Sequence, residues 1–453
     1  MSLITDWWKQ TTKTEKYVQV VTFLLFFSIT CDEFSTALVS ITTGMAWLFI
    51  IYDCVKAKSL QGFYLAKQKW MGLAVFLGSV LLASVLSGDQ KSIEIAVKYI
   101  WWVHPFILMT YLSKKADIKY AAVLGALVSV AVSSADMVYL YGLYLQKHKL
   151  PLFAANIRIG AFSKFPTIWG LILAGTLPFL WYSLNDKKIK SCKKLMLLHI
   201  IIAAFGGWAL WMTGSRGAMV GILVGAMLVF GIEYYVTRSP RLFLASALLC
   251  VAAAAVFLLV GIPKGNVRQV GDQMRLHLLK SSYAMWNDHK LLGVGLANWR
   301  TRYTASYYSY SLNKDDIRKA ALRRYAKKQG SKIGKIPKKR RIVIMKRAMR
   351  PYVKLGHPHN TIAWFFATTG IIGGAGYLFF MIHYGYLLMR KIRNHPEEWI
   401  FGAVLWVYLA MSIHGMVDAG ITHKGAARLL YLMLGLALSY SYYKKQKKIV
   451  SNR

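Results

Sequence analysis

Long runs of hydrophobic residues alternate with short polar connections along this chain. Each run has about the 20 residues that a helix needs to cross roughly 30 Å of hydrocarbon. Only helices and closed barrels satisfy their backbone groups in lipid, and no strict apolar/polar alternation of barrel-strand length occurs. We therefore predict an all-α polytopic membrane protein with about 12 transmembrane helices. The runs lie at residues 17–31, 34–53, 70–87, 94–112, 120–143, 166–184, 195–212, 217–236, 241–262, 360–389, 398–416 and 425–443.

One long polar stretch interrupts the pattern between the ninth and tenth runs. It divides the chain into transmembrane helices 1–9 over residues 1–262, a long loop over 263–357, and transmembrane helices 10–12 with a tail over 358–453. Within the loop, residues 313–330 place apolar side chains on one face of a helix, which is typical of amphipathic helices that lie on a membrane or on a bundle. Residues 336–354 are a second, less regular candidate.

A third amphipathic helix is predicted after Arg275. Apolar residues follow this arginine at helical spacing, and we expect them to form the apolar face of the helix. They are Leu276, Leu278, Leu279, Tyr283 and Trp286.

Composition and charge agree with a membrane protein and orient it. Hydrophobic residues make up 56% of the 453 residues, which is too apolar for a soluble chain of this length. Every second connection, together with both ends of the chain, is rich in Lys and Arg. Because positive loops stay inside, we expect these connections and both termini to be cytoplasmic. No cleavable signal peptide is evident.

Two connections on the expected outer side are also basic. Residues 144–165 carry four Lys or Arg and no acid, while 263–357 hold 24 basic and 4 acidic residues, giving +20 of the chain's total of +40. Nucleic acid is rarely met on that side, so anionic lipid head groups, phosphorylated glycolipids and lipid diphosphates are the expected partners. A solvated loop resting on lipid phosphates remains the plainer alternative.

Metal and disulfide chemistry are not expected. The four cysteines, at 31, 54, 192 and 250, lack metal-ligand spacing, and no Asp-x-Asp pair occurs in the expected outer connections. Glycoside hydrolases use two carboxylates and metal-dependent transferases use acidic ligands, so this sequence favours neither class. We predict no metal and no cofactor.

Arg216 stands at a helix start in the short outer turn "WMTGSRGAMVG". A cation is disfavoured at the positive end of a helix. Backbone N–H groups, an arginine and flanking glycines together can bind an anion, although such an arginine can also reach out to lipid phosphate.

His359 opens the tenth run in "HPHNTIAW". The helix N-terminus and a neighbourhood rich in arginine both disfavour a protonated imidazole, which leaves the neutral form that a general base needs. Asn360 can cap the helix or orient the imidazole, and His357 is a second candidate for support. By itself the pattern also fits a helix cap with an incidental histidine. Asp418 could orient His359, hold an acceptor or, as structural carboxylates commonly do, pair with a basic loop residue.

Three motifs in order resemble the O-antigen ligase and O-antigen polymerase superfamily. They are "TGSRGA", then "AMWNDHKLLGVGLANW" after Arg275, and His359–Asn360 followed by Gly370 and Gly373. Lys290 departs from the pattern, since the family often has proline there. The resemblance implies a GT-C-type glycosyltransferase of the bacterial inner membrane, with its active site at the periplasmic face.

The resemblance also implies a reaction and roles for residues. A glycan would move from undecaprenyl diphosphate to a sugar hydroxyl of lipid A-core, without metal and with inversion. His359 would be the general base, Arg216 and Arg275 would hold the diphosphate, and Arg158 and Lys164 would add contacts to it. An O-antigen polymerase with the same donor is the alternative within the superfamily. A transporter or flippase of an anionic lipid-linked glycan is the alternative from another class.

Overall fold

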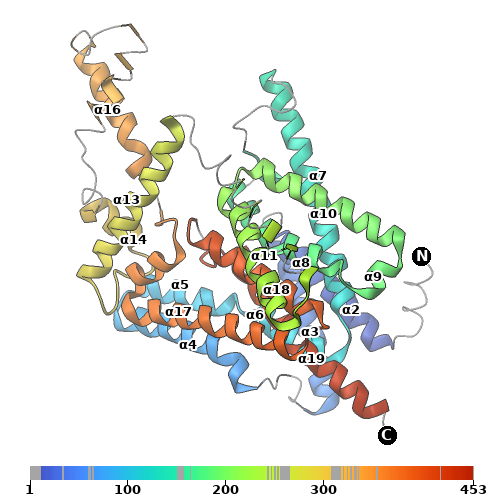
Figure 1. Ribbon diagram of the computed structural model, residues 1–453. Helices are drawn as coiled ribbons and strands as arrows, with labels where there is room; N and C mark the ends of the chain where they lie inside the picture. The colour runs from blue at the N-terminus through green and yellow to red at the C-terminus, as the bar shows by residue number, and fades with distance from the viewer. Residues whose placement is uncertain are drawn as a thin grey trace.

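The computed structural model describes residues 12–451 apart from 33–34, 60–62, 64–65, 150–157, 164, 242–243, 246, 249–250, 252–254, 256–265, 308–317, 320, 324, 327–328, 331–333, 335, 354–355 and 419. Every regular element among the described residues is helical, and most helices pack into one bundle (Figure 1). The elements are α2 (Lys13–Thr30), α3 (Thr36–Ala57), α4 (Lys67–Leu86), α5 (Gln90–Trp101), α6 (His104–Lys115), α7 (Lys119–His148), η2 (Ala161–Ser163), α8 (Pro166–Ser183), α9 (Lys187–Ser191), α10 (Lys193–Thr213), α11 (Arg216–Thr237), α13 (Asn266–Asp288), α14 (Trp299–Arg302), η3 (Tyr303–Tyr307), α16 (Lys338–Val353), α17 (Thr361–Asn394), α18 (Trp399–Gly415) and α19 (Lys424–Ser451).

The described chain contains 7 helical stretches that are long and apolar enough to cross a membrane. They correspond to predicted runs 2 to 5, 7, 8 and 10, and α18 is a shorter apolar helix. The run at 241–262 lies mostly outside the described residues. An all-helical fold with several candidate spans is therefore confirmed, whereas the number 12 stays a prediction.

The run predicted at 94–112 is two helices instead of one. Helix α5 ends at Trp101, and α6 begins at His104 with Pro105 in its first turn. Proline has no backbone N–H and its ring collides with the carbonyl four residues earlier, so it is accepted at a helix start and breaks a helix interior. The Nδ1 atom of His104 lies 2.8 Å from the carbonyl oxygen of Trp101 and so gives this carbonyl a hydrogen-bond partner at the interruption.

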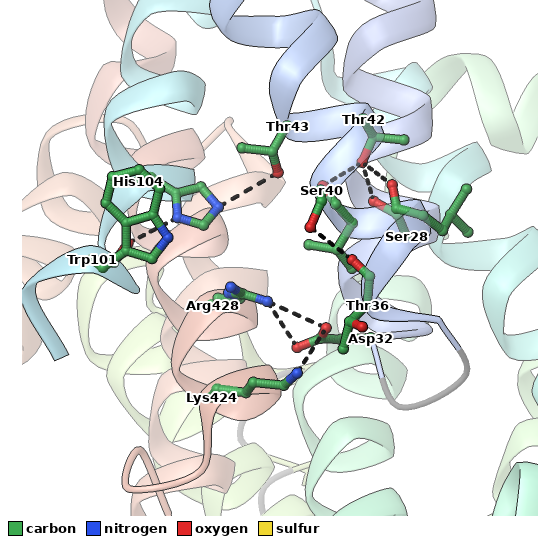
Figure 2. Close-up of polar contacts among 12 residues, drawn as sticks. Ser28, Asp32, Thr36, Ser40, Thr42, Thr43, Trp101, His104, Lys424 and Arg428 are labelled. Carbon is green, nitrogen blue, oxygen red and sulfur yellow. Dashed lines mark hydrogen bonds and ion pairs between the residues drawn. The ribbon is translucent and has the colours of Figure 1, made fainter. Parts of the chain in front are cut away.

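An ion-pair cluster ties the end of α2 to the start of α19 (Figure 2). Nη1 of Arg428 donates to both carboxylate oxygens of Asp32 at 3.2 Å, and Nζ of Lys424 lies 3.8 Å from the same carboxylate. The Asp32 side chain is completely buried. Because a buried carboxylate is costly unless it is paired, this cluster fixes the two helices relative to each other.

Part of the long loop folds as a helical hairpin on the bundle. Helix α13 packs on α14 and η3 through Leu278, Met285, Trp299 and Tyr303, and this small core includes Ala367 of α17. Beyond α13, on the side away from α17, stands α16 (Figure 1). The helix predicted at 336–354 is thus present, and half of the residues of the one predicted at 313–330 lie outside the described residues.

The apolar face predicted for the third amphipathic helix is divided between a buried and an exposed side in the structure. Leu278 is buried in the small core, but Leu276, Leu279 and Tyr283 are exposed on α13. The buried side of the helix also takes His277 and Ser281, which bond to Tyr303 and to the backbone of Tyr307. Polar residues with partners can occupy a packing face, so the apolar stripe alone did not identify it.

Helix α17 is interrupted at Gly370, where φ is 62° and ψ is −159°. Residues 289–298, which we call the docking turn, fill the interruption, and the N–H of Gly295 donates to the carbonyl of Thr368 at 2.9 Å. A Cβ atom on Gly370 would lie 2.2 Å from the backbone of Leu291. Glycine is therefore needed here both for its positive φ and for the close approach of two backbones.

Candidate active site

A pocket opens where four separate parts of the chain meet. It encloses about 350 Å3, counting the part open to solvent. The contributors are the start of α8 with the stretch before it, the turn between α10 and α11 with the start of α11, helix α13, and the end of α18 with the turn after it. The lining residues are Arg158, Thr167, Gly214, Ser215, Arg216, Gly217, Arg275, His414, Val417 and Asp418.

The α10–α11 turn brings two arginines to one side of the pocket. Gly214 has φ 59°, and a Cβ atom there would lie 3.0 Å from Cγ of Arg158. Arg158 packs over this glycine and donates from Nε to the carbonyl of Thr213 at 3.0 Å. Arg216 is the first residue of α11, at the helix start that the sequence predicted.

The three arginines of the pocket act on one another. Burial lowers the pKa of Arg158 below its ordinary value, Arg275 and Arg216 lower it further, and Asp418 acts in the opposite direction. Like charges therefore stand close together here, and the pocket has room for an anion between them. Lys164, the fourth predicted cation, lies outside the described residues.

His359 lies beside the pocket in a constrained conformation. Its φ is 54°, a left-handed value that is uncommon for a residue with a side chain. Its backbone N–H donates to Nδ1 of His357 at 3.1 Å, and its own Nδ1 lies 2.9 Å from Oδ1 of Asp418. An ionised carboxylate only accepts, so Nδ1 of His359 is the donor in this contact, and the tautomer with its proton on Nδ1 presents Nε2 as an acceptor.

The chemical state of His357 follows from its position. Burial lowers the pKa of His357 to about 4, helped by the neighbouring His359, while Asp418 opposes the shift. Neutral His357 can accept the N–H of His359, as the 3.1 Å contact requires. It thereby helps to hold the left-handed backbone of His359.

Asn360 performs the capping role that was one of its two predicted roles. Its Oδ1 accepts the N–H of Ala363 at 2.8 Å at the start of α17, and its Nδ2 donates to the carbonyl of Met416 at 2.8 Å. The second bond fixes the turn that carries Asp418 against the helix that follows His359.

Asp418 joins the two halves of the site. Besides its contact with His359, its Oδ2 lies 3.9 Å from Nη2 of Arg275. Orienting the histidine and pairing with a basic loop residue, which the sequence left as alternatives, therefore both occur in the structure.

Two polar residues of the pocket were not singled out from the sequence. Oγ of Ser215 lies 3.2 Å from Nε2 of His414, and Thr167 lies at the start of α8. The signal that could have identified Ser215 was its place inside "TGSRGA". Thr167 and His414 of α18 are 247 positions apart, and such a pair cannot be recognised from one sequence.

The acidic and imidazole groups could also coordinate a metal. One ligand atom from each of His357, His359 and Asp418 lies within 4.8 Å of the others. The arginines nearby oppose a divalent cation by charge repulsion, and the atoms that bond His359 to His357 and to Asp418 are already engaged. The expectation of a metal-free site stays a prediction that chelation can test.

A comparison with protein families now adds to this geometry. A family model described as O-antigen ligase matches residues 200–321, which contain Arg216 and Arg275 and end before His359. A comparison with curated proteins found no match. With its several apolar helices, the match indicates a multi-pass membrane protein and an enzyme of the ligase or polymerase type. The resemblance of this chain to the O-antigen ligase and polymerase superfamily is confirmed over residues 200–321.

Proposed function

We propose that the protein is an O-antigen ligase, a GT-C-type glycosyltransferase of the bacterial inner membrane. It transfers a glycan from undecaprenyl diphosphate to a sugar hydroxyl of lipid A-core. The observation that carries the proposal is the bridge made by Asp418, which contacts His359 on one side and Arg275 on the other. A base and an anion site are thereby held next to each other, as a transfer from a diphosphate requires.

The topology is part of the same proposal. Residues 1–262 and 358–453 form the membrane unit with both termini in the cytoplasm, and 263–357 is the periplasmic loop. Arg158, Arg216 and Arg275 then lie at the periplasmic ends of their helices or in outer connections, together with His359. The donor glycan is accessible on that side.

The reaction follows from the residues. Nε2 of His359 accepts the proton of the acceptor hydroxyl as its oxygen forms a bond to the anomeric carbon of the donor sugar. The bond from that carbon to the diphosphate oxygen breaks, and the leaving diphosphate takes the electron pair. Arg158, Arg216 and Arg275 stabilise the added charge. One direct displacement inverts the anomeric centre.

Asp418 supports this step without taking the proton. It keeps the Nδ1–H tautomer of His359 and stabilises the imidazolium that forms, as a carboxylate does behind a catalytic histidine. His357 and Asn360 position the ring through the backbone of the same segment.

The proposal is tested by reconstitution of the full chain with a lipid-linked glycan and lipid A-core. Covalent joining in the presence of EDTA, with an inverted linkage, is the expected result. Joining of two lipid-linked glycans instead would make the protein a polymerase. Movement of lipid across the bilayer without any joining would overturn the enzyme and favour a transporter.

A further inference from the structure

A buried serine and a buried histidine meet in the wall of the pocket. Ser215 and His414 both line it, and the two residues are 4% and 1% exposed. Oγ of Ser215 lies 3.2 Å from Nε2 of His414. Helix α8 leaves room for this contact, since a Cβ atom on Gly170 would lie 2.5 Å from Cβ of Ser215. The proposed reaction gives neither side chain a role, although a buried polar pair is costly to keep without one.

The hydrogen bond between the two side chains runs from His414 to Ser215. Nδ1 of His414 is buried and has no hydrogen-bond partner among the described residues. A proton on Nδ1 would be a buried N–H without an acceptor, and such donors are rarer in proteins than buried acceptors without a donor. The favoured tautomer therefore carries its proton on Nε2 and donates it to the hydroxyl oxygen. A histidine that acted as a base on Ser215 would instead be oriented by a third group.

This direction leaves the hydroxyl hydrogen of Ser215 for a ligand. Its oxygen accepts from His414, and the part of the chain that the structure describes offers no acceptor for its hydrogen. Ser215 directly precedes α11, so the hydroxyl lies at the positive end of that helix. A buried donor in a pocket lined by three arginines fits an anion with several oxygen acceptors.

We propose that Ser215, positioned by His414, donates its hydroxyl hydrogen to an oxygen of the diphosphate that the pocket holds. The arginines supply charge, whereas the hydroxyl supplies a neutral donor whose place is fixed by the imidazole. His414 is a positioning residue, because it acts through Ser215. This inference rests on the proposed function for the identity of the diphosphate as part of a lipid-linked donor.

The test measures binding of inorganic diphosphate to the full chain in nanodiscs by calorimetry. Ser215→Ala should weaken binding about ten-fold, because a hydrogen bond to a charged group contributes about one factor of ten. The loss should be equal at about 50 mM and about 500 mM NaCl, since salt screens charges and a neutral group is removed. A loss that shrinks at high salt would mean that the substitution displaces Arg216, and it would overturn the inference.

Variants of His414 test the positioning. His414→Gln keeps an N–H donor at the place of Nε2, so the affinity should stay within about two-fold of the wild type. His414→Leu should weaken binding about five-fold, because the hydroxyl is no longer held. In Ser215→Ala/His414→Leu the loss should stay at about ten-fold, as expected when one group acts through the other. Losses that multiply to about fifty-fold would indicate a structural role for His414 and overturn its positioning role.

The matched control is Ser412→Ala, two residues before His414 on α18. The hydroxyl of Ser412 donates to the carbonyl of Tyr408 at 2.6 Å, and Ser412 is not among the residues that line the pocket. The affinity for inorganic diphosphate should be unchanged in this variant. A ten-fold loss here would assign the effect of Ser215→Ala to a general disturbance of the bundle and overturn the inference.

Two outcomes separate this inference from the proposed function. Unchanged affinity in Ser215→Ala would overturn the inference, whether or not the protein transfers a glycan. The expected loss of affinity in Ser215→Ala, together with no glycan transfer by the wild type, would support the contact to the anion and overturn the proposed function alone.

Discussion

Two clusters in this molecule each place one aspartate among several cations, and they differ in where the cations point. In the first, Arg428 and Lys424 both reach Asp32, whose side chain has no exposed surface (Figure 2). In the second, Asp418 has Arg275 at 3.9 Å, but the arginines line an open pocket with it. The first cluster is closed and its carboxylate is fully paired. The second lines a pocket that is open to solvent with three arginines and one carboxylate.

This difference separates a structural ion pair from a binding site. Nη1 of Arg428 donates to both oxygens of buried Asp32, so the pair locks α2 to α19 and the carboxylate has little to gain from a ligand. The second cluster combines excess positive charge with a histidine held by Asp418, so an anion would relieve its repulsion. A count of charged residues would not distinguish the structural cluster from the binding site, whereas the geometry does.

The largest expected effect is on His359. His359→Ala removes the proton acceptor, and a general base contributes about a hundred- to ten-thousand-fold, so the transfer rate per folded molecule should fall by roughly a thousand-fold. The thermal midpoint should change little, because the side chain is partly exposed. Transfer at more than a tenth of the wild-type rate would remove His359 from the mechanism.

Arg275 should come next in size. Arg275→Ala should lower the transfer rate by roughly a hundred-fold, because one donor to the leaving diphosphate is lost. Arg275→Lys should recover part of this loss, since it restores the charge without the planar fork. The measurement is the transfer rate and the Michaelis constant as the donor concentration is varied. An equal loss in both variants would indicate a role in folding.

Replacement of Asp418 by asparagine should affect the transfer rate, whereas replacement of Asp32 by asparagine should affect stability. Asp418→Asn should lower the rate by about ten- to a hundred-fold through loss of histidine orientation, with little change in stability. Asp32→Asn should lower stability by about 3–5 kcal/mol, because it leaves Arg428 without its charge partner, while the rate per folded molecule stays unchanged. Thermal melts and rates on the same samples check both. A loss of stability in Asp418→Asn together with a loss of rate in Asp32→Asn would contradict the distinction between the two clusters.

The smallest expected effect is a loss of stability of helix α13 at acidic pH. This helix brings Arg275 to the pocket. Burial, together with Lys280, lowers the pKa of His277 to about 4. An unfolded histidine titrates at about pH 6.5. Between pH 6.5 and pH 4, His277 therefore binds a proton in the unfolded segment but stays neutral in the folded one. Stability of the hairpin should therefore be complete above pH 6.5 and decline below it.

Hydrogen exchange can measure this decline. Protection of the α13 amides, corrected for intrinsic rates, should fall roughly ten-fold between pH 7 and pH 5. In His277→Gln the side chain cannot titrate, so protection should no longer depend on pH. The same decline in the variant would assign the effect to another group.

The sequence predicted elements better than it predicted contacts. Runs of about 20 apolar residues define helices that cross a membrane, so most helices were found from local pattern alone. The break at Pro105 was missed because the apolar run continues through it. His359 and Asp418 are 59 positions apart in the chain, and a single sequence does not show that two such residues are in contact. The face of α13 was misjudged because an apolar residue can face a core, a lipid or a ligand.

The interruption of α17 has a consequence for how the protein is made. The two halves of this helix meet at Gly370 only where the docking turn supplies backbone partners from an earlier part of the chain. In the proposed topology the docking turn has to cross the membrane before α17 can take its final shape. That topology therefore makes translocation of the loop and completion of α17 one coupled event during biosynthesis.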